Sequence, residues 1–163
     1  MPSDTLTTLA TLVGAKLRAK GLMLATAESC TGGWVAQAVT AIAGSSEWFE
    51  RGFVTYSDAA KQEMLGVSAG TLAAHGAVSE DTAREMAAGA LAHSRAQAAV
   101  AITGIAGPTG GSPEKPLGLV CFAWAVKEGA IRAETRRFKG DRESVRRQSV
   151  IAALQGMLEL LEG

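Results

Sequence analysis

The stretch Ala27-Glu28-Ser29-Cys30-Thr31-Gly32-Gly33 decides how this chain is interpreted, because of what lies on either side of it. An apolar run, Leu22-Met23-Leu24-Ala25, precedes it, and a helical pattern over 31–41 follows it. α/β enzymes often hold a nucleophile or bind an anion where a strand leads through a tight polar turn into a helix. The physical reason is that the first N–H groups of a helix have no partner within it.

Two residues of this turn, Ser29 and Cys30, are potential nucleophiles. Gly32 and Gly33 would let the backbone come close to a ligand. The alternative is an ordinary helix start, with Ser29 or Thr31 as the N-cap and the glycines as turn residues. The local pattern leaves both interpretations open.

Composition limits the class of protein. The chain has 163 residues, enough for one domain over 1–163 with a substantial core, and 47% of them are hydrophobic against 20% charged. Its 16 basic and 16 acidic residues balance, which gives no global case for nucleic acid. No apolar run approaches the roughly 18 residues of a membrane span, and the N-terminus lacks a signal-peptide pattern. We therefore expect a cytoplasmic protein with no membrane contact.

Cysteine and histidine are scarce. Cys30 and Cys121 stand far apart, and the two histidines are His75 and His93. These spacings suit neither a disulfide framework nor a zinc site, so we expect no metal. The low histidine count also weakens a Ser-His or Cys-His scheme for activating a nucleophile.

Periodicity predicts a three-layer α/β/α fold with a mixed sheet. Strands and helices alternate at first, and a hairpin then closes the sheet. The first expected helix is capped by Ser3 or Asp4 and stops at Gly21, with an apolar stripe over 6–17. Further helices are expected over 31–41, 58–65, 79–91 and 141–161, and strands over 22–26, 48–56, 98–102, 118–126 and 130–138. A loop rich in Gly and Pro is expected over 103–116.

A second chemical constellation is Tyr56-Ser57-Asp58-Ala59-Ala60-Lys61. It begins at a strand end, where side chains emerge towards a cleft. A lysine that loses contact with water can lose its proton near neutral pH and act as a base, which a serine nucleophile needs. With histidine scarce, a Ser-Lys arrangement is the natural alternative. A surface lysine and a half-buried strand tyrosine are the structural alternatives.

Two further segments could bind an anion. The stretch from Thr103 through Gly104 and Gly107 to Gly111 starts where a buried strand ends, and it could line a pocket, act as a movable lid or simply form a surface loop. Arg142 and Arg146 lie one turn apart at an expected helix start, which suits a phosphate, although salt bridges would also explain them. The segment 127–147 holds eight basic against four acidic residues.

Taken in order, these segments resemble one family, the C-terminal domain of the competence-induced protein CinA. The shared stretches are Ala27-Glu28-Ser29-Cys30-Thr31-Gly32-Gly33, the Thr-Gly-Ile-Ala-Gly-Pro-Thr-Gly-Gly run over 103–111, and Gly140-Asp141-Arg142 with a later Val145-Arg146. The resemblance covers essentially the whole chain. The longer family form carries an N-terminal domain that has no counterpart here.

The resemblance implies an amidohydrolase that converts nicotinamide mononucleotide to nicotinic acid mononucleotide and ammonia, without a cofactor, in pyridine nucleotide salvage. Carried onto this chain, the pattern makes Ser29 the nucleophile, assisted by Lys61 and Tyr56. N–H groups around 31–33 would hold the oxyanion. The expected substrate-binding residues are Glu28, Cys30, Thr31, Gly32, Gly33, Thr103, Gly104, Gly107, Arg142 and Arg146.

Three alternatives remain open at this point. Cys30 could be the nucleophile, although no histidine is obviously available to ionise it. The same pocket could bind a mononucleotide without chemistry and act as a sensor. A phosphoryl-transfer enzyme would need metal-binding carboxylates near the Gly-rich loops, where only Glu28 stands. We also expect a homo-oligomer, because the first and last helices carry apolar faces.

Overall fold

The computed structural model describes residues 2–163, with side chains from residue 5 onward. Five strands form one mixed sheet in the order β2-β1-β3-β4-β5. The first three strands of that order run parallel to one another, and β4 and β5 add antiparallel pairings at one side. The strands are β1 (Leu24–Glu28), β2 (Phe49–Val54), β3 (Ala98–Gly104), β4 (Leu119–Val126) and β5 (Ile131–Arg137).

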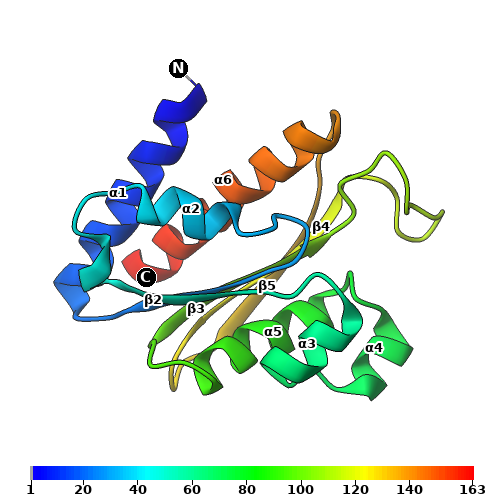
Figure 1. The fold of residues 1–163 in the computed structure, drawn as a ribbon, viewed down its shortest axis with the longest axis horizontal. Coiled ribbons are helices and arrows are strands. Elements are labelled where there is room, and N and C mark those ends of the chain that lie inside the picture. Colours follow the sequence, from blue (N-terminus) through cyan, green and yellow to red (C-terminus); the bar gives the residue numbers. More distant parts are fainter. Residues whose placement is uncertain (1) are drawn as a thin grey trace.

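Helices cover both faces of this sheet (Figure 1). One layer holds α1 (Pro2–Lys20), α2 (Trp34–Thr40) and α6 (Arg142–Glu162). The other holds α3 (Asp58–Leu65), α4 (Ala69–His75) and α5 (Glu80–Ala92). A short 3-10 helix, Ser45–Glu47, leads into β2. The expected three-layer α/β/α architecture with a mixed sheet is confirmed.

The two faces of the sheet bury different side chains, because successive strand residues point to opposite sides. On β4, Phe122 and Trp124 face the layer of α1 and α6, where their rings stack with centroids 5.5 Å apart. The Trp124 indole N–H donates to the Ala153 carbonyl at 2.9 Å, so its polar atom is satisfied in the core. The face towards α5 is lined largely by alanines, which bring that helix close to the sheet.

The helices of the second layer approach each other closely at Gly89 of α5. A Cβ atom at Gly89 would lie 1.9 Å from the carbonyl oxygen of Leu65, the last residue of α3. Only a glycine permits this contact, because no real Cβ atom comes so near to backbone. The position of α3 therefore depends on the missing side chain at residue 89.

Two elements differ most from expectation, besides shifts at strand ends such as that of β1, which covers Leu24–Glu28 rather than 22–26. Helix α2 begins at Trp34 rather than at 31, because Gly32 and Gly33 adopt left-handed φ angles of 59° and 101° that no right-handed helix contains. Helix α4 was not predicted from the sequence. None of its residues is buried, so its sequence lacks the regular spacing of apolar residues that indicates a helix. Its start is capped by the Ser68 side chain, which accepts the Thr71 N–H at 2.9 Å. Across the described residues, no helix is both long and apolar enough to cross a membrane.

Candidate active site

The parallel strands place the candidate residues at one edge of the sheet. Ser29 follows β1, Tyr56 closely follows β2, and Gly104 ends β3, so three carboxyl ends converge as expected for an α/β sheet. Between them lies a cavity of about 220 Å³. It is lined by Ser29, Cys30, Tyr56, Lys61, Ala77, Val78, Thr103, Gly104, Ala106 and Arg142.

The contact between Lys61 and Ser29 is the central feature of this cavity. The Lys61 Nζ lies 3.0 Å from the Ser29 Oγ, within hydrogen-bond reach, and it also donates to the Thr55 carbonyl at 2.8 Å. Lys61 stands in the first turns of α3, whose start is capped by the Ser57 side chain. The helix start therefore aims the lysine back at the nucleophile turn. A nucleophile and a base in direct contact are the minimum for acyl transfer.

Burial tunes Lys61 for this role. The residue is only 1% exposed, and loss of water around the ammonium lowers its pKa below the ordinary 10.5, against a weaker opposite effect of Asp58. A lysine shifted in this direction gives up its proton more readily. The neutral amine can then accept the Ser29 hydroxyl proton across the 3.0 Å contact.

Glu28 organises the turn that carries Ser29. Its fully buried carboxylate accepts the Thr31 hydroxyl at 2.6 Å and the backbone N–H groups of Val35 and Ala36 at 2.9 and 3.0 Å. Those two N–H groups belong to the first turn of α2 and would otherwise lack partners. The helix start is therefore capped by Glu28, and neither Ser29 nor Thr31 serves as its N-cap.

These contacts bear on the expected oxyanion site around 31–33. The Gly32 N–H donates to the Ser29 carbonyl at 3.1 Å, so that group is occupied within the turn. Glu28 takes the N–H groups of Val35 and Ala36, which lie beyond the expected residues. The oxyanion role of the N–H groups in this turn stays a prediction.

Arg146 supports the same turn from α6. It donates to the carbonyl oxygens of Cys30 at 3.0 Å and of Thr31 at 3.2 Å, and its guanidinium lies 5.6 Å from the centre of the Trp34 ring. These three contacts engage the side chain within the protein. Arg146 therefore acts here as a brace of the turn, and Arg142 is the arginine that lines the cavity.

Arg142 links the cavity to the Gly-rich loop. It donates to the Tyr56 hydroxyl at 3.0 Å and to the Gly107 carbonyl at 2.8 Å. Tyr56 is 63% exposed, and its hydroxyl is held by this arginine at the mouth of the cavity. The two residues that the sequence placed in separate motifs thus form one contact.

A second cavity of about 630 Å³ adjoins the first, and both share Ala106 and Arg142 in their linings. It lies between the Gly-rich loop and the segment that joins β5 to α6. Its lining is Ala106, Gly107, Pro108, Leu117, Gly118, Arg137, Phe138, Lys139, Gly140, Asp141 and Arg142. Gly107 and Arg142 were expected near a ligand, and Arg137 and Lys139 belong to the basic segment 127–147.

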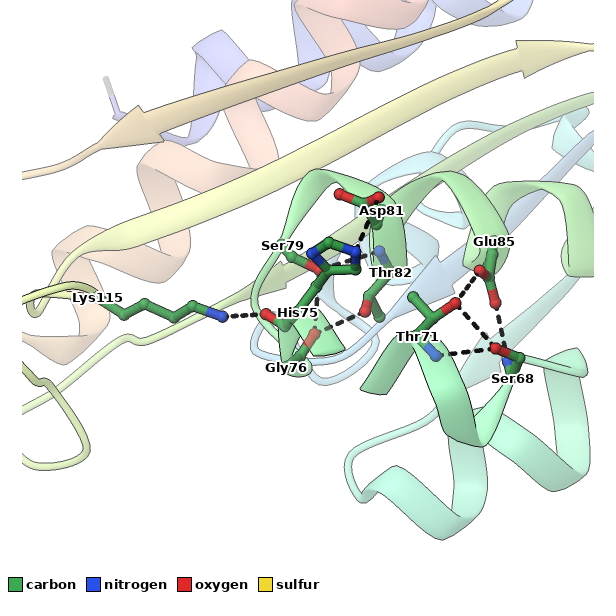
Figure 2. A network of polar contacts seen from close by, with 9 residues as sticks. All are labelled: Ser68, Thr71, His75, Gly76, Ser79, Asp81, Thr82, Glu85 and Lys115. Carbon is green, nitrogen blue, oxygen red and sulfur yellow. Dashed lines mark hydrogen bonds and ion pairs between the residues drawn. The ribbon is translucent and has the colours of Figure 1, made fainter. Parts of the chain in front are cut away.

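One wall of the small cavity comes from the segment between α4 and α5, which was not expected from the sequence. Ala77 and Val78 line the small cavity. Their side chains are aliphatic, so nothing in their chemistry indicates a functional site. Figure 2 shows how this segment is held: the Gly76 carbonyl accepts the hydroxyls of Ser79 at 3.0 Å and Thr82 at 2.7 Å.

Two further contacts fix the same wall. The Thr103 hydroxyl donates to the Ala77 carbonyl at 2.8 Å from the end of β3. Lys115, which projects from the Gly-rich loop, donates to the His75 carbonyl (Figure 2). The loop is therefore tied to the wall that faces the nucleophile.

Cys30 lies next to Ser29, but burial keeps its thiol protonated. It is 5% exposed, and burial raises the pKa of its thiol to about 12. At neutral pH the thiol is protonated, which makes it a poor nucleophile. Its Sγ also fills space beside Gly104, where a Cβ atom would lie 3.1 Å from the sulfur and 2.7 Å from Val120.

Seven of the expected site residues thus meet in the small cavity, and Gly107 lines the larger one. The remaining five, Glu28, Thr31, Gly32, Gly33 and Arg146, belong to neither lining, and they build or brace the turn that presents Ser29. Among the described residues, no group of three or more His, Cys, Asp or Glu side chains could hold a metal ion.

Known proteins resemble this chain over nearly its whole length. The chain is 57% identical over 155 residues to the nicotinamide-nucleotide amidohydrolase PncC of Escherichia coli K12, covering 95% of this chain and 94% of that protein. It is 52% identical over 158 residues to the protein of the same name from Pseudomonas putida, covering 96% and 98%.

A solved structure and a family model agree with these relatives. The crystal structure of the competence/damage inducible protein CihA from Agrobacterium tumefaciens superposes with a TM-score of 0.94 at 49% identity, covering 98% of this chain and 96% of that one. Residues 6–161 match the family model of the CinA C-terminal domain. The chain belongs to the CinA C-terminal domain family.

Proposed function

We propose that this chain is a nicotinamide-nucleotide amidohydrolase that releases ammonia from nicotinamide mononucleotide and leaves nicotinic acid mononucleotide, as a step of pyridine nucleotide salvage. The observation that carries the proposal is the 3.0 Å contact between the buried Lys61 amine and the Ser29 hydroxyl. The relatives that cover nearly the whole chain carry the name of this activity.

The first half of the reaction is acylation. The neutral Lys61 amine takes the hydroxyl proton as the Ser29 Oγ attacks the carboxamide carbon. The tetrahedral intermediate carries its negative charge on the former carbonyl oxygen, next to backbone N–H groups of the turn that follows Ser29. Lys61 then gives its proton to the amide nitrogen, the C–N bond breaks, and ammonia leaves.

The second half is hydrolysis of the acyl-enzyme. Lys61, neutral again, takes a proton from water, whose oxygen attacks the ester carbon. Collapse of this intermediate breaks the bond to the Ser29 Oγ, which recovers its proton from Lys61. The product leaves as the carboxylic acid and passes its proton to solvent, where ammonia takes it up as ammonium, and one water has been consumed for one ammonia formed.

The surrounding residues orient the substrate. Tyr56 lies at the cavity mouth, where Arg142 holds its hydroxyl. From there the tyrosine assists the reaction at the carboxamide. The ribose phosphate lies towards Arg142 and the Gly-rich loop, since Arg146 is engaged with the Cys30 and Thr31 carbonyls. The small cavity then holds the pyridine ring with its carboxamide.

The test is ammonia release from nicotinamide mononucleotide by the purified protein, with and without a chelator, alongside Ser29→Ala. We expect release that survives chelation and falls at least about a thousandfold in the variant, because removal of a nucleophile disables the whole catalytic unit. Binding of the mononucleotide by the variant, measured by calorimetry, shows that its pocket is intact.

Other results would identify the alternatives. Binding without ammonia release by the wild-type protein would overturn the enzyme proposal in favour of a nucleotide sensor. Loss of activity on chelation would indicate metal-assisted chemistry. Full activity in Ser29→Ala would remove the serine from its role and direct attention to Cys30.

A further inference from the structure

We propose that Arg137 and Lys139 in the 630 Å³ cavity bind the substrate phosphate, and that they select the nucleotide over the corresponding nucleoside. This inference rests on the proposed function and singles out two residues of the basic segment 127–147, which the family resemblance did not assign to the site. It starts from the two adjoining cavities and their different linings.

The size of the cavities separates the two ends of the ligand. Pockets that enclose small organic ligands usually measure about 300–1,000 Å³. The cavity at Ser29, about 220 Å³, is smaller than that range, whereas its neighbour, about 630 Å³, lies within it. A ligand whose reacting carboxamide reaches Ser29 must therefore extend past Ala106 and Arg142, which both cavities share.

Charge identifies what the larger cavity accepts. Its lining includes three cationic residues, Arg137, Lys139 and Arg142, against a single carboxylate, Asp141. That carboxylate is already engaged, because it accepts the Ser144 N–H at 2.8 Å as the cap of α6. A phosphate monoester carries a charge of about −1.5 to −2 at pH 7, so it matches the surplus of positive charge.

The three cations come from β5, from α6 and from the segment between them. Arg142 starts α6 and uses its two terminal nitrogens on the Gly107 carbonyl and the Tyr56 hydroxyl. Arg137 ends β5 and uses its Nε on the Leu117 carbonyl at 3.4 Å, which holds it beside the Gly-rich loop. The terminal nitrogens of Arg137 and the Lys139 amine can therefore turn towards a phosphate that lies beside Arg142.

An apolar surface between these charges suits the rest of the ligand. Leu117, which is 42% exposed, and Phe138 line the same cavity. Phe138 is anchored from behind, since it packs edge-on against Phe122 with centroids 6.3 Å apart. The cavity therefore offers a fixed apolar floor with a cationic rim, as expected for a sugar phosphate.

The experiment compares Arg137→Gln, Lys139→Gln and the double variant with wild-type protein. We measure KM in ammonia release from nicotinamide mononucleotide, and Kd for the same compound by calorimetry. Charge-assisted hydrogen bonds are among the strong ones, so the double variant should raise both KM and Kd about tenfold or more. Lys127→Gln is the matched control, because it removes the same charge at the far turn of the same hairpin and lines neither cavity; its KM and Kd should stay within about twofold.

Wild-type protein alone provides a second test, which can overturn the inference even if the double variant does not fold. Inorganic phosphate should compete with nicotinamide mononucleotide. Nicotinamide riboside, which lacks the phosphate, should have a kcat/KM at least about tenfold lower. A folded double variant with wild-type KM and Kd, or a wild-type protein that treats riboside and nucleotide alike, would overturn the inference.

The two proposals fail in different ways. If the wild-type protein binds the mononucleotide through Arg137 and Lys139 but releases no ammonia, the amidohydrolase proposal fails and the phosphate site stands. If ammonia is released and the charges make no difference, the phosphate site alone fails.

Discussion

The turn over 27–33 and the loop over 105–118 lie at the same edge of the sheet, yet they are built in opposite ways. In the turn, Glu28 is fully buried and accepts three hydrogen bonds, and Arg146 binds two carbonyls from outside. In the loop, residues 108–114 are all exposed, and the segment extends away from the body of the molecule (Figure 1).

The difference separates chemistry from recognition. Amide hydrolysis needs the nucleophile and its base to be held within a fraction of an ångström, which a buried hydrogen-bonded turn provides. Substrate entry needs a wall that can move, and an exposed loop attached at its base and at one lysine provides that. Substitutions in the turn should therefore mainly lower kcat. Substitutions in the loop should mainly alter KM, and by a smaller factor.

The largest effect is expected at Lys61. Lys61→Met removes the base while keeping the volume, and kcat should fall about 10²–10⁴-fold. Lys61→Arg is the sharper comparison, because it keeps the positive charge but cannot lose a proton, and it should be nearly as inactive. Ammonia release from nicotinamide mononucleotide gives kcat for both. Activity near wild type in either variant would contradict the role of Lys61 as base.

The pH dependence follows from the direction of the Lys61 pKa. Activity requires the neutral amine, so kcat/KM should rise with pH and level off below the ordinary lysine pKa of 10.5. The unfolded chain binds more protons than the folded one between the two pKa values, so the free energy of unfolding should also rise with pH there. Lys61→Met should lose this rise in denaturant titrations. An identical pH slope in both proteins would disprove the shift.

A smaller but distinct effect is expected at Glu28. Glu28→Gln replaces an accepting oxygen with an NH₂ group, so one of the groups bound by the carboxylate loses its acceptor. Stability should fall by about 1–3 kcal/mol, and kcat about tenfold, as the turn shifts. Glu114→Gln makes the same change in the exposed loop and should alter the stability by less than about 0.5 kcal/mol. Equal effects of the two substitutions would remove the contrast between turn and loop.

Lys115 tests the loop itself. Lys115→Ala removes the contact with the His75 carbonyl that ties the loop to the cavity wall. Partly exposed contacts of this kind contribute about 0–1 kcal/mol, so KM should change by at most about fivefold and kcat less. Steady-state kinetics separate the two constants. A fall in kcat of a hundredfold would show that the loop shares in the chemistry.

The smallest effect is expected at Cys30. Its thiol stays protonated at neutral pH, because burial raises its pKa to about 12. Cys30→Ala should lower kcat by no more than about threefold, and the wild-type thiol should react slowly with iodoacetamide in the folded protein. A loss comparable to that of Ser29→Ala would instead identify the cysteine as the nucleophile.

Local patterns were enough to predict the architecture and the edge at which the site lies. Strands that end at Glu28, Val54 and Gly104 run parallel, so the segments after them had to meet. The assignment of Ser29 and Lys61 rested on the same logic together with the family resemblance, and their catalytic roles stay predictions, as do the oligomer and the cytoplasmic location.

Long-range contacts account for what the sequence did not reveal. Arg146 bonds to Cys30 across 116 residues of chain, and no local spacing distinguishes that brace from a phosphate ligand. Glu28 reaches the N–H groups seven and eight residues ahead only because Gly32 and Gly33 turn the chain back. The larger cavity joins residues near 107 to residues near 138, which become neighbours only when the hairpin forms.

The close approach at Gly89 ties a position outside both cavity linings to the placement of Lys61. Its neighbour Leu65 ends the same eight-residue helix that carries Lys61. A methyl group at residue 89 would therefore displace that helix. The amine would move relative to Ser29 although every catalytic side chain was intact. A glycine that lines neither cavity therefore sets the distance between the proposed base and the proposed nucleophile.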